Sequence, residues 1–405
     1  MATIAVVGTL DSKGHEHAFV AERIRELGHE PLLIDVGTLT EPQVKADISR
    51  EAVLSEAGVN LPREEDRGRR VGAMAEALPT LLARLAEEGA IDAVISLGGS
   101  GGTAIATAGM RALPIGFPKL MVSTMASGNT ANYVGTKDIV MFPSIVDVAG
   151  LNQISETIFT RAGAAICGMA NARIAVDGGK PLIVASMFGN TTECVDHARG
   201  LLEEAGYEVL VFHATGAGGR TMESLIESGM VAGVLDITTT EWADELLGGV
   251  LSAGPERLDA AGKAGAPAIV TPGCLDMANF GERDTVPAEF GNRNFYIHNP
   301  QVTLLRTNAE ECAKLGKILA DKVNAYTGPV TVLLPTKAIS IISAEGQPFH
   351  DAAADKALFD AIRDNLSATV KLVELDAEIN APEFAAACAE ELLAHLKNRS
   401  LQQGT

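Results

Sequence analysis

The stretch AVISLGGSGGT, residues 93–103, has the pattern of a buried strand that runs into a glycine-rich turn. Residues 93–97 are apolar or small, which is typical of a parallel strand covered on both faces. The helix that follows is expected to end near Ala112. A strand, a short turn and a helix in this order are the unit from which parallel α/β sheets are built. The stretch therefore predicts an α/β fold.

The same alternation of strands and helices continues on both sides of this unit. In the first part of the chain we expect further strands at 3–7, 31–36, 119–123 and 139–142. In the second part we expect strands at 182–187, 208–213, 232–236, 268–271, 302–305, 330–334 and 370–375. The turn-rich stretch 177–180 separates the two runs. We predict two Rossmann-like, doubly wound parallel-sheet domains with an interdomain cleft, a nucleotide-binding domain at 1–177 and a second α/β domain at 178–405.

The composition argues against two classes of binding partner and predicts the cellular compartment. The formal net charge is −20, which repels a phosphate backbone, so no nucleic-acid partner is expected. No apolar run approaches the roughly 20 residues of a membrane helix, so no membrane contact is expected. The five cysteines show no CxxC spacing and no signal peptide is recognisable, which predicts reduced thiols and a cytoplasmic location.

The glycine-rich turn is the strongest candidate for a functional site. Its four glycines let the backbone approach a charged group closely, and the start of the following helix adds partial positive charge. It is not a Walker loop, because no lysine follows the last glycine, and its spacing also misses GxGxxG. A tight packing turn would need fewer glycines, so we predict phosphate binding. The predicted contacts are Gly98, Gly99, Ser100, Gly101, Gly102 and Thr103.

The loop that follows the strand at 119–123 is a second candidate. It is rich in small hydroxyl residues, glycine and asparagine, which suits contact with a phosphate or a sugar. Alone it would be interpreted as a solvated polar turn, and its place beside the glycine-rich turn favours binding. The candidate contacts are Ser123, Thr124, Ser127 and Gly128.

The loop after the first strand, from Gly8 to Glu16, combines a carboxylate, a hydroxyl group and a lysine. Asp11 is suited to hold a divalent metal ion and Lys13 to contact a phosphate. The alternative is that Asp11 or Ser12 caps the helix that follows. The residues alone leave both interpretations open.

The second half of the chain has its own glycine-rich loop, after the strand at 208–213. Its glycines and arginine predict a second anion-binding loop, formed by Gly216, Gly218, Gly219 and Arg220. His213 ends the preceding strand, where an acid or a base can act, although a histidine at a strand end is more often simply hydrogen-bonded.

Other strand ends and connections add candidates for metal binding, catalysis and recognition. Asp236 is a candidate ligand for a metal ion or a ribose, and Glu241 is a candidate acid–base group. Arg293 begins a stretch to Pro300 that is suited to recognise a base or a carboxylate and is equally compatible with a structured connection. Cys274 has no identifiable histidine partner and is expected to be an inert thiol.

Four stretches together resemble one family: 7–14, 98–103, 123–130 and 212–223. It is an uncharacterised bacterial and fungal family, similar to the ATP-binding N-terminal region of the plant resistance protein that acts against tomato mosaic virus. The resemblance runs over essentially the whole chain. It implies two Rossmann-like subdomains, ATP binding, and a homodimer or a higher homo-oligomer. ATP contact is implied chiefly for 98–103, and also for 123–130 and 11–13.

These observations leave three functions open. The first is an ATP-binding protein that uses Mg²⁺, in which phosphate lies on the glycine-rich loops. The second is an isomerase or a lyase that acts on a phosphorylated or acidic small metabolite, with His213, Glu241 and Arg293 as acid–base and anchoring groups. The third is a non-catalytic protein-interaction module whose dimer ATP stabilises. The missing Walker lysine favours slow or absent ATP hydrolysis.

Overall fold

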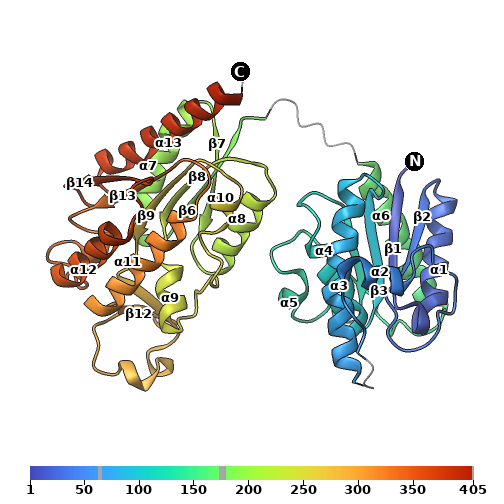
Figure 1. Ribbon diagram of the computed structural model, residues 1–405. Helices are drawn as coiled ribbons and strands as arrows, with labels where there is room; N and C mark the ends of the chain where they lie inside the picture. The colour runs from blue at the N-terminus through green and yellow to red at the C-terminus, as the bar shows by residue number, and fades with distance from the viewer. Residues whose placement is uncertain (63–65, 173–178, 404–405) are drawn as a thin grey trace. The chain divides into compact units, whose positions relative to one another are not determined.

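The computed structural model describes residues 1–62, 66–172 and 179–403. By its internal contacts the chain divides into two compact units, Met1–Val176 and Asp177–Thr405 (Figure 1). The boundary that we expect at residue 177 lies outside the described residues. Among the described residues, no helix combines the length and the apolar character needed to cross a membrane.

The N-terminal unit is built on a five-stranded sheet in the order β2-β1-β3-β4-β5, in which every pair of neighbours is parallel. Its strands are Thr3–Gly8 (β1), Glu30–Asp35 (β2), Ala93–Gly98 (β3), Lys119–Ser123 (β4) and Val140–Pro143 (β5). Its helices are Leu10–Glu26 (α1), Arg50–Ala57 (α2), Arg67–Glu87 (α3), Ser100–Arg111 (α4), Ala131–Val134 (α5) and Gln153–Asn171 (α6).

Helices cover both faces of this sheet (Figure 1). Successive residues of a strand point to opposite faces, and in β1 both sets are apolar. Ile4 and Val6 belong to the core that also contains side chains of α1 and α6. Ala5 and Val7 belong to the core under α2, α3 and α4. The continuous apolar strands therefore fold as expected, into a parallel sheet wound on both sides.

The C-terminal unit contains a six-stranded parallel sheet in the order β14-β13-β9-β8-β6-β7. Its strands are Leu182–Met187 (β6), Glu208–His213 (β7), Val231–Thr238 (β8), Ala268–Gly273 (β9), Val330–Pro335 (β13) and Lys371–Leu375 (β14). The longer helices are Thr192–Glu204 (α7), Ala217–Glu227 (α8), Ala309–Asn324 (α11), Ala352–Asn365 (α12) and Pro382–Gln403 (α13), and the shorter ones are Glu241–Leu247 (α9) and Ala260–Lys263 (α10).

This second sheet is also covered on both faces. Ile183 and Ala185 lie in the core formed with α7 and α13. Val184 lies between them and points the other way, and it is fully buried too. The prediction of two α/β units with parallel, Rossmann-like sheets is confirmed.

One predicted strand forms, but it pairs with other strands than expected. The strand expected at 302–305 does not join the parallel sheet. It forms Val302–Arg306 (β12), the centre of a three-stranded antiparallel sheet with Met277–Phe280 (β10) and Phe295–Asn299 (β11). Only two residues, Pro300 and Gln301, connect β11 to β12. A link of this length cannot make the crossover that a parallel pair requires, so the pair is antiparallel.

The two units share one strand order. Numbered within each unit, the strands follow the order 2-1-3-4-5, with β14 added at the far edge of the second sheet. In this order the connection after the first strand leads toward one edge of the sheet. The connection after the third strand leads toward the other edge. The crevice between these strand ends, β1 and β3 in one unit and β6 and β8 in the other, is where open α/β sheets bind ligands.

Candidate functional site

A cavity of about 200 Å³ lies in the N-terminal unit at this crevice between β1 and β3. It is lined by Thr9 and the first turn of α1 after β1, by the loops after β2 and β5, by the start of α4 and by the start of α3. The lining residues are Thr9, Asp11, Ser12, Lys13, Thr38, Leu39, Arg67, Val71, Gly99, Ser100, Gly101, Gly102, Ile105 and Asp147. The structure thus brings the predicted glycine-rich turn together with the predicted loop after β1.

The first turn of α4 presents backbone N–H groups without partners. Gly99 is the N-cap of α4, and no side chain caps this helix. The N–H of Thr103 donates to the carbonyl of Gly99 at 2.9 Å. Within the described residues, the N–H groups of Ser100, Gly101 and Gly102 donate to no acceptor. These three donors, together with the positive end of the helix dipole, suit the binding of an anion.

Neither packing nor backbone angles require glycine at three positions of this turn. None of the four glycines has a positive φ. A Cβ placed on Gly99, Gly101 or Gly102 would lie 3.7–3.8 Å from its nearest neighbour, which is ordinary contact. Only at Gly98 would it be tight, 3.1 Å from the Cα of Gly102. The glycines at 99, 101 and 102 therefore leave this part of the cavity wall without side chains. Packing of the fold does not require this.

Two cationic side chains border the cavity. Lys13 lies at a kink in α1, with φ −136° and ψ 29°, and its ammonium group donates to the carbonyl of Val148. Arg67 begins α3 and is exposed, and its guanidinium lies 4.0 Å from a Cβ placed on Gly101. The sequence does not mark Arg67 as a candidate, because the cluster at 67–70 also fits a salt-bridged helix start, and the neighbouring Arg69 does pair with Asp66.

A buried histidine fixes the position of Lys13, which lies in the first turn of α1 and not in the loop expected there, because α1 begins at Leu10. The Nδ1 of His17 lies 2.7 Å from the carbonyl oxygen of Lys13, and its Nε2 accepts the N–H of Leu97 at 3.3 Å. The ring therefore ties α1 to the end of β3. Burial lowers the pKa of His17, which keeps the imidazole neutral, as these two contacts require. A Cβ on Gly8 would lie 2.4 Å from this ring, so glycine is needed there for packing.

Asp11 holds the loop after β2. Its Oδ2 accepts the N–H groups of Thr38 at 3.0 Å and Leu39 at 2.8 Å. It does not cap α1, whose N-cap is Thr9 without a side-chain hydrogen bond. Asp147, in the loop after β5, is a second carboxylate on the cavity wall, and the sequence pattern does not reveal it.

The other loop predicted to contact a nucleotide does not line this cavity. The hydroxyl groups of Ser123 and Thr103 are buried and lie 2.6 Å apart, and the Thr103 hydroxyl donates to the carbonyl of Gly99. They join the end of β4 to the glycine-rich turn. Thr124, Ser127 and Gly128 are exposed and lie outside the cavity wall.

The second predicted anion loop is filled by a carboxylate of the protein itself. Glu241 Oε1 accepts the N–H groups of Gly216 at 2.7 Å and Gly219 at 3.1 Å. Gly218, Gly219 and Arg220 lie inside α8, not in a loop. A Cβ on Gly219 would lie 2.2 Å from Glu241, and one on Gly218 would lie 1.8 Å from the carbonyl of His213. These glycines are required by packing, unlike those of α4.

Asp236 and Glu241 belong to a buried cluster around Arg257. Arg257 is 1% exposed and donates to both carboxylate oxygens of Asp236 at 2.6 Å, to Glu241 at 2.6 Å and to Glu223 at 3.0 Å. Burial alone would lower the pKa of Arg257, but the surrounding carboxylates raise it well above its usual value. The oxygens proposed for a metal ion at Asp236 are thus taken by a guanidinium.

The three candidate acid–base groups are not assembled into one site. Glu241 is 1% exposed in the Arg257 cluster. Arg293 makes a two-pronged ion pair with Glu311, at 2.8 and 2.7 Å. His213 is exposed at the end of β7 and lines a different cavity. In the described parts of the chain, no group of three or more His, Cys, Asp or Glu side chains is placed to hold a metal ion. Cys274 is buried, and burial raises its pKa well above the usual value, so an inert thiol fits.

Comparison with known proteins gives relatives along almost the whole chain. The chain is 47% identical over 395 residues to a UPF0261 protein of Clostridium tetani, covering 96% of this chain and 98% of that protein. It is 44% identical over 392 residues to a UPF0261 protein of Rhizobium meliloti, covering 96% and 97%. It is 42% identical over 337 residues to the ToMV resistance protein Tm-1(GCR237) of Solanum lycopersicum, covering 81% of this chain and 44% of the tomato protein.

Solved structures add little to this. A UDP-N-acetylglucosamine 2-epimerase from Rickettsia bellii matches with a TM-score of 0.23 and 12% identity, over 66% of this chain and 78% of that one. A likeness at this score supports no inference about activity. Two family models match residues 2–175 and 180–396, described as the N-terminal and C-terminal domains of the uncharacterised protein family UPF0261. With these two matches and the identity to its relatives, the chain belongs to the UPF0261 family.

Proposed function

We propose that the N-terminal unit binds the phosphate groups of a nucleotide in the cavity between β1 and β3. The observation that carries this proposal is the bare wall at Gly99, Gly101 and Gly102, where a Cβ would fit but is absent. A close approach of the backbone to a ligand is the remaining physical reason for glycine at such positions. ATP is the nucleotide that the sequence resemblance implies.

The charges around the cavity support an anionic ligand. The first turn of α4, whose N–H groups at residues 100–102 have no acceptor among the described residues, lines it, and Lys13 and Arg67 supply positive charge in a chain whose net charge is −20. The cavity volume of about 200 Å³ is below the roughly 300–1,000 Å³ of typical ligand pockets. It therefore suits the phosphate end of a nucleotide, not the entire molecule.

The residues present also fit a magnesium ion beside the phosphates. Mg²⁺ in nucleotide sites is usually held by one or two carboxylates together with phosphate oxygens. Asp11 and Asp147 both line the cavity and would hold it. A bound ion would neutralise part of the phosphate charge. The backbone donors, Lys13 and Arg67 would orient the phosphate chain.

Titration calorimetry with ATP and Mg²⁺ tests this proposal. We expect the wild-type chain to bind and Lys13→Met to bind about 10- to 100-fold more weakly, as for the loss of one charged contact. Lys45→Met removes an exposed lysine of the same unit that lies outside the cavity wall, and should bind like wild type. An equal loss in both variants, or no binding of ATP to a folded wild-type chain, would contradict the proposal.

A further inference from the structure

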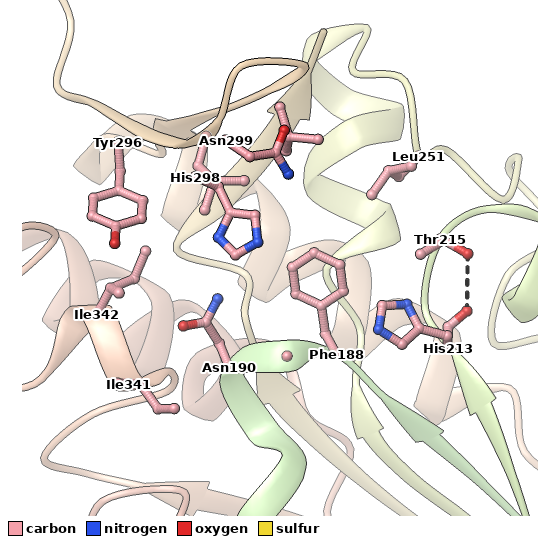
Figure 2. A pocket seen from close by; sticks show the side chains of 13 residues that line it. Phe188, Asn190, His213, Thr215, Leu251, Tyr296, His298, Asn299, Ile341 and Ile342 are labelled. Carbon is pink, nitrogen blue, oxygen red and sulfur yellow. Dashed lines mark hydrogen bonds between the residues drawn. The ribbon is translucent and has the colours of Figure 1, made fainter.

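The C-terminal unit contains a larger cavity, of about 530 Å³, at the carboxyl ends of β6 and β7 (Figure 2). This volume lies within the roughly 300–1,000 Å³ typical of small-molecule sites. The cavity is lined by the loop after β6, the end of β7, the hairpin of β11 and β12, and the turn at Ile341 and Ile342. It lies beside the end of β6, one of the two strands that border the crevice of this sheet, and extends toward the edge strand β7.

The described walls of this cavity are mostly apolar and aromatic. Phe188 and Tyr296 contribute rings, and the aliphatic walls are Leu251, Val302, Leu304, Ile341 and Ile342. Of the described residues that line it, none is a Lys, Arg, Asp or Glu. A charged ligand would lose its hydration there without gaining an ion pair, which disfavours it. A neutral ring would be stabilised by the rings and the aliphatic side chains.

Several polar side chains of this wall have no strong hydrogen-bond partner in the part of the chain that the structure describes. Across the described residues, no hydrogen bond engages the imidazole of His213 or of His298. The Asn190 amide has one weak contact, from Nδ2 to the Met277 sulfur at 3.7 Å, and its side-chain oxygen accepts none. Figure 2 shows the Asn190 amide extending toward the His298 ring, with Phe188 beside them. The Phe188 ring in turn lies 5.4 Å from the His213 ring, centroid to centroid.

A β-bulge in β11 adds Asn299 to this wall beside His298. The pairing of β11 with β12 shifts between Ile297 and Asn299, so that His298 has no partner across the ladder. Adjacent residues of a regular strand face opposite sides, yet His298 and Asn299 both line the cavity. Bulges re-aim side chains in this way, commonly beside functional sites. The antiparallel sheet thus supplies two polar side chains of the cavity, His298 and Asn299, and the segment after β6 and the end of β7 supply Asn190 and His213.

We infer that this cavity binds a neutral planar aromatic or heteroaromatic ring. The ring would pack against Phe188 and Tyr296, and its polar substituents would hydrogen-bond with Asn190, His213 and His298. All of these groups both donate and accept, so they suit a ring that carries a donor and an acceptor. A nucleobase and a substituted phenol share this chemistry. The inference concerns the C-terminal unit alone and does not depend on phosphate binding in the N-terminal unit.

Titration calorimetry with phosphate-free probes tests it on the full chain. The probes are adenosine, which carries a nucleobase, and 4-hydroxybenzamide, a neutral ring unrelated to nucleotides. Cyclohexanecarboxamide is the non-aromatic control. We expect at least one aromatic probe to bind and the control to bind at least about tenfold more weakly, because it cannot stack on the rings. Binding of adenosine would assign the ligand to the nucleobases. Binding of 4-hydroxybenzamide alone would assign it to the substituted phenols.

Variants locate the binding. His298→Ala and Asn190→Ala should each weaken it by about fivefold or more, as for the loss of a neutral hydrogen bond. His197→Ala removes an exposed histidine of α7 outside the cavity and should bind like wild type. His298 is exposed, so its variant should fold, which circular dichroism can verify. The inference is overturned if neither aromatic probe binds at about 5 mM, if the control binds equally well, or if both cavity variants bind like wild type.

Discussion

At the scale of single residues, the two glycine clusters of this chain look alike in sequence and differ in their physical cause. Gly219 cannot carry a side chain, because the carboxylate of Glu241 occupies the space beside it. Gly101 can carry one, because its nearest neighbour, a methyl group of Val71, would be 3.7 Å from the new Cβ. Packing accounts for the glycines of α8, and it does not account for those at 99, 101 and 102 in the α4 turn.

A buried carboxyl group makes the stability of the protein depend on pH. Asp244 is fully buried and accepts the N–H groups of Leu251 and Asn279 and the side-chain amide of Asn279. Burial raises its pKa from the ordinary value of 3.8 to about 7. Asp276 is buried as well, and its pKa is raised in the same direction, to about 6.

Because the folded-state pKa of Asp244 lies above the unfolded value, the folded protein binds more protons between these two pKa values. The free energy of unfolding should therefore fall as the pH rises from about 4 to about 7, by at most about 1.4 kcal/mol per pH unit for this group. Urea unfolding at about pH 5 and about pH 8 measures the loss of stability.

Between about pH 5 and about pH 8, Asp244→Asn should lose less free energy of unfolding than wild type. Some loss should remain, because the raised pKa of Asp276 acts in the same direction. The control variant Asp364→Asn changes an exposed carboxylate, so it should lose as much free energy of unfolding as wild type. A loss in Asp244→Asn as large as in wild type would contradict the assignment to this residue.

At the scale of elements, the first turns of α4 and α8 should differ in amide hydrogen exchange. The N–H groups of Gly216 and Gly219 already donate to Glu241, so they should exchange slowly without ligand. Those of Ser100, Gly101 and Gly102 donate to no described acceptor, so they should exchange fast and become protected when ATP binds. Exchange measured by NMR or mass spectrometry resolves both turns. Protection of the α4 turn without ATP, or protection by ATP at α8 in its place, would contradict this account.

The sequence predicts which segments form strands better than it predicts which strands pair. The strands of both parallel sheets follow from continuous apolar runs, because burial on both faces leaves that pattern. The antiparallel sheet was missed, although the two-residue link at Pro300 and Gln301 excludes a crossover. The meeting of Asp11 and Lys13 with the glycine-rich turn follows from their shared edge of the sheet. Arg67, Asp147 and the Glu241 contact to α8 depend on long-range packing, which no local periodicity encodes.

At the scale of the whole molecule, each unit has its own hydrophobic cores. Among the described residues, the core clusters of the N-terminal unit are formed by residues of that unit, and those of the C-terminal unit by residues of the C-terminal unit. A ligand that binds only the folded form of a unit raises the stability of that unit, by about 2.7 kcal/mol at 100 times its dissociation constant. ATP bound at α4 should therefore raise the unfolding temperature of the N-terminal unit.

The measurement that tests the central claim most directly is scanning calorimetry of wild type and Gly101→Ala, each with and without ATP and Mg²⁺. Without ligand, the variant should unfold at the same temperature as wild type or slightly higher, because alanine fits and lowers the entropy of the unfolded chain, worth about 0.4–1 kcal/mol. With ATP, wild type should gain stability and the variant should gain little or none. A variant that is destabilised without ligand, or one that ATP stabilises as much as wild type, would show that Gly101 serves the fold and not a phosphate.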